Sequence, residues 1–76
     1  MRYTREQVEE MEILLLFDLA SIQEGIKVHK AAGSEAVAAT KRLFDKGLIT
    51  QVDGGYLTDI GFRAAEHAQG LQTILS

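Results

Sequence analysis

The segment from Ser34 to Gly61 constrains the fold more than any other part of the chain, because signals for three structural elements follow one another there with almost no linker. Ser34 can cap a helix through its hydroxyl, and Gly47 can end that helix in the left-handed conformation. Thr58 can cap the next helix in the same way as Ser34. These signals predict one helix over residues 34–46 and another over residues 59–75.

A hairpin is predicted between these two helices, at about residues 48–58. Leu48 to Val52 and Tyr56 to Thr58 flank the sequence Asp53-Gly54-Gly55. Asp and Gly accept the positive φ that a narrow β-turn requires. We therefore expect a two-stranded hairpin that leads directly into the last helix.

Two further helices are predicted before residue 34, each from a capping box. Thr4 with Gln7 starts a helix over residues 4–20, and Ser21 with Glu24 starts one over residues 22–32 that should end at Gly33. The expected fold is mainly α, with four helices and one small two-stranded hairpin in a single domain over residues 1–76.

Composition limits the function classes that a chain of 76 residues can serve. No cysteine is present, so a disulfide framework and a thiolate metal site are both excluded. The acidic residues near the N-terminus argue against a signal peptide, and the apolar run Ile13 to Phe17 is too short to span a bilayer. We expect a cytoplasmic protein.

The net charge of −3 disfavours nucleic-acid binding as an average, but its distribution is uneven. Residues 21–47 carry five cations against three acids, which gives this segment a net charge of +2. The cations are Lys27, Lys30, Lys41, Arg42 and Lys46, and the acids are Glu24, Glu35 and Asp45. The segment is either a DNA-binding surface or an ordinary solvated one.

A helical wheel divides the predicted helix over residues 34–46 into two faces. The inner face is expected to hold Ala36, Val37, Thr40, Leu43 and Phe44, with Leu43 and Phe44 in the core. The outer face is expected to hold Glu35, Ala38, Ala39, Arg42, Asp45 and Lys46, with Lys41 on its flank. Small residues beside long cations could enter a major groove, although an ordinary amphipathic helix shows the same pattern.

Residues 41–67 resemble the winged helix-turn-helix superfamily of bacterial transcriptional regulators. The resemblance lies in Lys46-Gly47-Leu48-Ile49 at the end of a recognition helix and in Leu57-Thr58 before the next helix. More narrowly, QEGIKVHKAA, DKGLIT, DGGYLTDIG, AAEHAQ and the closing TILS are similar to a family of short, uncharacterised bacterial proteins described as DNA-binding.

This resemblance implies a winged helix-turn-helix whose helix over residues 34–46 is the recognition helix of a small transcriptional regulator that binds double-stranded DNA. The candidate DNA contacts are Lys27, Lys30, Ser34, Glu35, Ala38, Ala39, Lys41, Arg42 and Lys46. A homodimer is also expected, because the first helix is broadly apolar and the last one ends in Leu71, Ile74 and Leu75.

A second function is a protein-interaction module on the same scaffold, favoured by the acidic first helix and by a hairpin without Lys or Arg. Catalysis is not expected, since the chain has no phosphate-binding glycine loop, no HExxH and no cysteine nucleophile. A metal site would need His29 and His67 to converge with Glu24 or Glu66. We expect no cofactor or metal, and a packed His29.

Overall fold

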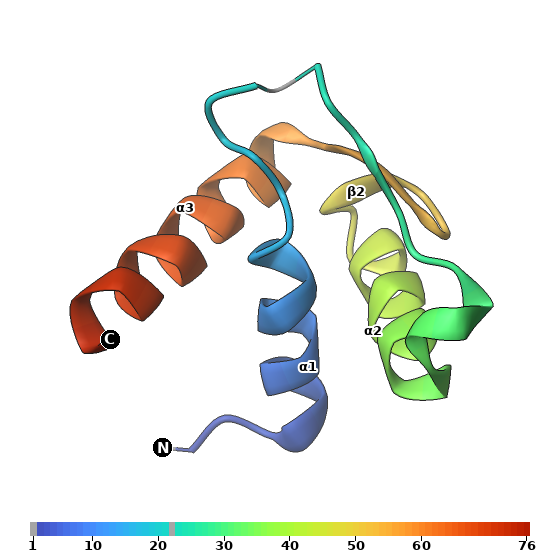
Figure 1. Ribbon diagram of the computed structural model, residues 1–76, viewed down its shortest axis with the longest axis horizontal. Helices are drawn as coiled ribbons and strands as arrows, with labels where there is room; N and C mark the ends of the chain where they lie inside the picture. The colour runs from blue at the N-terminus through green and yellow to red at the C-terminus, as the bar shows by residue number, and fades with distance from the viewer. Residues whose placement is uncertain (1, 22) are drawn as a thin grey trace.

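The computed structural model describes residues 2–21 and 23–76, which form a helical body around a small antiparallel sheet (Figure 1). The described residues form three α-helices, one short 3₁₀ helix and three strands. In chain order they are α1 (Arg5–Leu14), β1 (Ile26–Lys27), η1 (Lys30–Ala32), α2 (Ser34–Asp45), β2 (Ile49–Gln51), β3 (Gly54–Leu57) and α3 (Asp59–Leu75).

Helix α1 begins at the predicted capping box but ends earlier than expected. The Thr4 hydroxyl accepts a hydrogen bond from the Gln7 amide at 3.0 Å, and the Gln7 side chain accepts one from the Thr4 amide at 2.9 Å. The prediction that the helix runs to residue 20 is wrong. After Leu14 the chain turns, and the Gln69 side-chain amide of α3 donates to the Leu14 and Phe17 carbonyls at 3.2 and 2.7 Å. These carbonyls are satisfied by a distant residue instead of by a further helical turn.

The predicted second helix over residues 22–32 is wrong; its first residue lies outside the described part of the chain. Strand β1 and the short η1 occupy the described remainder. Ile26 and Lys27 pair with Gly55 and Gly54 of β3. A Cβ on Gly25 would lie 2.6 Å from the Gly55 carbonyl oxygen, so only glycine lets the two backbones approach this closely. Tertiary pairing therefore overrides the local helix signal.

The sheet has three strands in the order β1-β3-β2, and the expected two-stranded hairpin is its β2–β3 half. Ile49 pairs with Leu57, and Gln51 pairs with Gly54 after an irregularity in register. Gly54 and Gly55 adopt the predicted positive φ, at 135° and 76°, but the prediction that they form the turn is wrong: Val52 and Asp53 form it, and the two glycines begin β3. The third strand was missed because β1 is short and becomes a strand only through its contact with β3.

The junctions on either side of the hairpin follow the predicted local chemistry. Gly47 has a φ of 80° after α2, and the Leu48 amide donates to the Leu43 carbonyl at 3.0 Å. The Thr58 hydroxyl accepts from the Gly61 amide at 3.1 Å, which caps α3 as predicted. The cap predicted at Ser34 is wrong, because Gly33 is the N-cap and Ser34 is the first residue of α2.

The core lies where α1, α2, α3 and the sheet meet. Its fully buried members come from all of these elements: Ile13, Leu14, Phe17, Ala39, Leu43, Ile49 and Ala65. Figure 1 shows α1 between α2 and α3, with the sheet across one end of the helices. Within the described residues, no helix has the length and apolar character needed to cross a membrane.

Candidate functional site

The structure exposes most of the predicted DNA contacts and brings three of them, Ser34, Ala38 and Lys41, together along one side of α2. Ser34, Glu35, Ala38 and Lys41 are exposed on α2, while Lys27 lies in β1 and Lys30 begins η1. Ala39 is completely buried, so its predicted place on the outer face is wrong. The inner face of α2 is rotated toward α1 and centres on Leu43, which brings Ala39 into the core.

The orientation of α2, which differs from the predicted one, also places Arg42 and Lys46 beside acids of α1. The Arg42 Nε donates to the Glu10 carboxylate of α1 at 2.7 Å, and Lys46 Nζ bonds the other oxygen of the same carboxylate. Arg42 further reaches the Glu6 carbonyl at 3.3 Å and the Glu9 carboxylate at 3.6 Å. Both cations are therefore held by acids of a neighbouring helix.

Glu10 is the centre of this network, and its side chain is only 7% exposed. Burial alone would raise the pKa of Glu10, but hydrogen bonds from Lys46 and Arg42 and their positive charges outweigh burial and lower it. Glu10 in turn raises the pKa of the Arg42 guanidinium. A carboxylate that stays charged here joins α1 to α2 and, together with Glu9, offsets the positive charges of Arg42 and Lys46.

The other cation of α2 is also paired, because Lys41 Nζ lies 3.0 Å from the Asp45 carboxylate on the helix surface. This pair is exposed, so it contributes little to stability, yet it offsets the charge of Lys41. Among the described residues, Lys27 and Lys30 form no ion pair within 4.0 Å. They are the two predicted contacts whose charge is not balanced by a neighbouring acid.

An apolar groove lies beside the exposed face of α2, where a DNA-binding surface was expected. We call it the α2 groove; its lining residues are Val28, Ser34, Val37, Ala38, Thr40, Lys41, Val52 and Asp53. Val37 and Val52 are exposed. Phe44 is 41% exposed, so the prediction that it lies in the core is wrong, while that for Leu43 is confirmed. The same orientation of α2 that buries Ala39 leaves Phe44 facing solvent.

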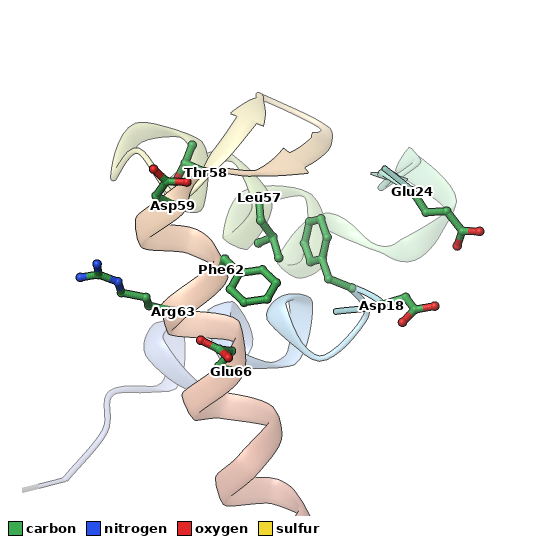
Figure 2. Close-up of a pocket in the computed structure, with 9 residues that line it drawn as sticks. Asp18, Glu24, Leu57, Thr58, Asp59, Phe62, Arg63 and Glu66 are labelled. Carbon is green, nitrogen blue, oxygen red and sulfur yellow. The ribbon is translucent and has the colours of Figure 1, made fainter. Parts of the chain in front are cut away.

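A second surface feature is a pocket of about 440 Å³ between the α1–β1 connection and the start of α3. We call it the acidic pocket. Phe17, Leu57 and Phe62 give it an apolar floor, and its charged rim consists of Asp18, Glu24, Asp59, Arg63 and Glu66. Figure 2 shows Phe62 and Leu57 pointing toward each other, with the Asp18 and Glu24 carboxylates turned outward. Four acids against one cation give this rim a net charge of −3.

Sequence reasoning missed the acidic pocket because its acids are far apart along the chain. The contribution of α3 was detectable, since Asp59, Phe62 and Glu66 recur at helical spacing on one side of that helix. The approach of Asp18 and Glu24 was not detectable, because it depends on how the α1–β1 connection folds back. No group of three or more His, Asp or Glu residues within the described chain could hold a metal ion.

The histidines are placed differently from the expectation. His29 precedes η1 and is exposed, which contradicts the predicted packed position, and His67 is exposed on α3. The packed position assumed a helix over residues 22–32. Since the chain there forms β1 and η1, His29 has no apolar helix face to join.

Comparison with known proteins identifies a family but no function. The chain matches a family of unknown function, DUF5669, along residues 1–76, and it belongs to that family. No curated protein and no solved structure matches the chain.

Proposed function

We propose that this protein is a cytoplasmic protein-interaction module, in which α2 and the β2–β3 hairpin form a winged-helix scaffold that recognises a protein instead of DNA. The observation that carries the proposal is the pairing of Arg42 and Lys46 with Glu10. A helix that reads DNA needs cations free to replace counterions on phosphates. Here acids of α1 already pair with Arg42 of α2 and with Lys46, which follows α2 directly.

The α2 groove supports the same conclusion. Three valines and one alanine make up half of its lining, and Val37 and Val52 expose apolar surface in it. Apolar surface at the centre of a concave patch, with charged groups at its edge, is typical of protein interfaces. Lys41 and Asp53 occupy that edge. An apolar segment of a partner protein is the ligand that this groove fits.

Titration of labelled duplex DNA tests whether the ion pairs of Arg42 and Lys46 keep these cations from binding phosphates. Non-specific DNA binders show Kd values of about 10⁻⁴ to 10⁻⁶ M at physiological salt. We expect no binding by the parent in that range. The Glu10→Gln variant, which keeps the shape of the side chain, should gain weak, salt-sensitive binding, because Lys46 loses its acidic partner and Arg42 keeps only the Glu9 carboxylate at 3.6 Å. Tight binding by the parent would contradict the proposal.

The groove itself is tested by a photo-reactive side chain placed at Val52 in living cells. We expect one discrete crosslinked protein, which Val37→Lys should remove because it places a charge in the groove. The same probe at His67, on the exposed surface of α3, is the matched control. Equal crosslinking from both positions, or crosslinking that persists in the Val37→Lys variant, would contradict the groove as the binding surface.

DNA binding is the second candidate, favoured by Lys27 and Lys30, which no described acid balances. With Ser34, Ala38 and Lys41 they would form a smaller contact surface than the sequence predicted. In that case Lys27→Ala and Lys30→Ala should each reduce the slope of log affinity against log salt by about 0.9. The same titration therefore separates the two candidates.

A further inference from the structure

The acidic pocket has the chemistry to bind a cationic group attached to an apolar one. Its floor offers two phenylalanine rings and Leu57, and its rim has a net charge of −3. Among the described residues, none of the rim acids forms an ion pair within 4.0 Å. An aromatic side chain flanked by guanidinium groups would match both the floor and the rim.

The chain carries such a segment at residues 2–5, which we call the arm: Arg2, Tyr3, Thr4 and Arg5. Tyr3 is 64% exposed, and both arginines are exposed. Neither arginine forms an ion pair with a described residue. Two cations beside an exposed aromatic ring, at the start of α1, complement the charge and the apolar floor of the acidic pocket.

We propose that the arm of a second copy of this chain docks in the acidic pocket, with Tyr3 against the phenylalanine floor and Arg2 and Arg5 beside Glu24 and Glu66. In Figure 1 the N-terminus lies at one end of the molecule and the first turn of α3 lies at the other. The arm therefore cannot fill the pocket of its own chain. Two antiparallel copies related by a twofold axis would exchange arms, which makes the contact twice.

This contact differs from a dimer formed through the apolar surface of α1 and the exposed Leu71, Ile74 and Leu75 of α3, because it depends on exposed charges. Salt screens exposed charges over about 10 Å at 0.1 M ionic strength. Arm exchange should therefore weaken as salt rises. An apolar interface would hold or strengthen under the same change.

Sedimentation equilibrium on the full chain and on two charge-reversed variants tests the proposal. The arm variant carries Arg2→Glu and Arg5→Glu, and the pocket variant carries Glu24→Arg and Glu66→Arg. We expect the parent to dimerise at about 50 mM salt, with an association constant that falls about tenfold or more by 500 mM. Each variant alone should be monomeric, because its arm and its pocket have the same sign.

An equimolar mixture of the two variants should dimerise again. The native arm of the pocket variant meets the native pocket of the arm variant, and the reversed arm meets the reversed pocket. A control with Glu12→Arg and Glu35→Arg has the same charge change as the pocket variant and should dimerise like the parent. Circular dichroism confirms that every variant is folded before its mass is interpreted.

Three results would overturn the arm exchange: a monomeric parent at low salt, variants that dimerise as well as the parent, or a mixture that stays monomeric. The second result would assign the dimer to the apolar surface of α1 and α3. None of these substitutions lies in the α2 groove or in the Glu10 network. A negative result for the arm exchange therefore does not affect the proposed function, and a negative result for the proposed function does not affect the arm exchange.

Discussion

Replacing Gly61 with alanine should destabilise the protein, although alanine is the better helix former. Gly61 lies in the first turn of α3, directly against the backbone of Leu48. A methyl group at this position would overlap the Leu48 carbonyl oxygen and would lie 2.8 Å from its carbonyl carbon and 3.1 Å from its Cα. All three neighbours are backbone atoms, so no flexible side chain can move aside.

The expected magnitude combines two opposing effects. Forcing an extra carbon into a packed position costs about 1–3 kcal/mol. Alanine recovers at most about 1 kcal/mol of helix propensity relative to glycine, and less in a first turn. The free energy of unfolding should therefore fall by about 1–2 kcal/mol. In a domain of this size each 1 kcal/mol lowers Tm by about 4–8 °C.

Gly70 provides the matched control in the same helix. A Cβ at Gly70 would have no atom within 4 Å, so Gly70→Ala adds helix propensity without a clash. It should stabilise the protein by about 0.5–1 kcal/mol. Urea unfolding of the parent and both variants measures the difference. If Gly61→Ala were as stable as the parent, the close contact between α3 and the Leu48 carbonyl would be refuted.

The remaining predictions concern the core, the charge network and the end of α1. Leu43→Ala should cost about 2–5 kcal/mol, whereas Phe44→Ala should cost about 1 kcal/mol or less, and thermal unfolding that ranked them the other way would refute the orientation of α2. Folding lowers the pKa of Glu10 below its ordinary value of 4.5. Ionised Glu10 therefore stabilises the folded protein above pH 4.5, and this stabilisation is lost as the pH falls through the lower pKa of the folded state. Glu10→Gln should therefore be less stable than the parent at pH 7, and the gap should close below pH 4.5; a constant gap in urea unfolding would refute the role of the charge. Gln69→Leu should cost about 1–3 kcal/mol, because the Leu14 and Phe17 carbonyls lose their donor, and amide exchange should show a frayed end of α1. Unchanged protection of the amides at the end of α1 would contradict this role of Gln69.

The elements that the sequence predicted correctly depend on contacts within a few residues. The capping box at Thr4 and Gln7, the left-handed Gly47 and the cap at Thr58 all formed as expected. Each is a local hydrogen bond or backbone preference that the neighbouring sequence specifies almost completely. This is why the hairpin and the helices on either side of it were recognised from residue order alone.

The candidate site was only partly predictable. The exposure of Lys27, Lys30 and Lys41 followed from their charge. The surroundings of Ala39 and Arg42 did not follow, since a helical wheel gives the angles between side chains but not the direction of the core. Only the packing of α1 on α2 fixed that direction. The same packing brought Glu10 to Arg42 across 32 positions of the chain.

By itself, the sequence determined where α1 starts, where α2 ends and where α3 starts. The tertiary structure decided which partners those elements meet. Ile26 and Lys27 carry a helix-compatible pattern, yet they form a strand because they pair with Gly55 and Gly54, and a Cβ on Gly54 would clash with the Ile26 carbonyl. Contacts between distant segments outweigh local propensities of a few tenths of a kcal/mol per residue. Strand pairing and burial, which depend on distant residues, therefore set the final fold. Contacts of the same kind pair Arg42 and Lys46, which the sequence had suggested for DNA, with acids of α1.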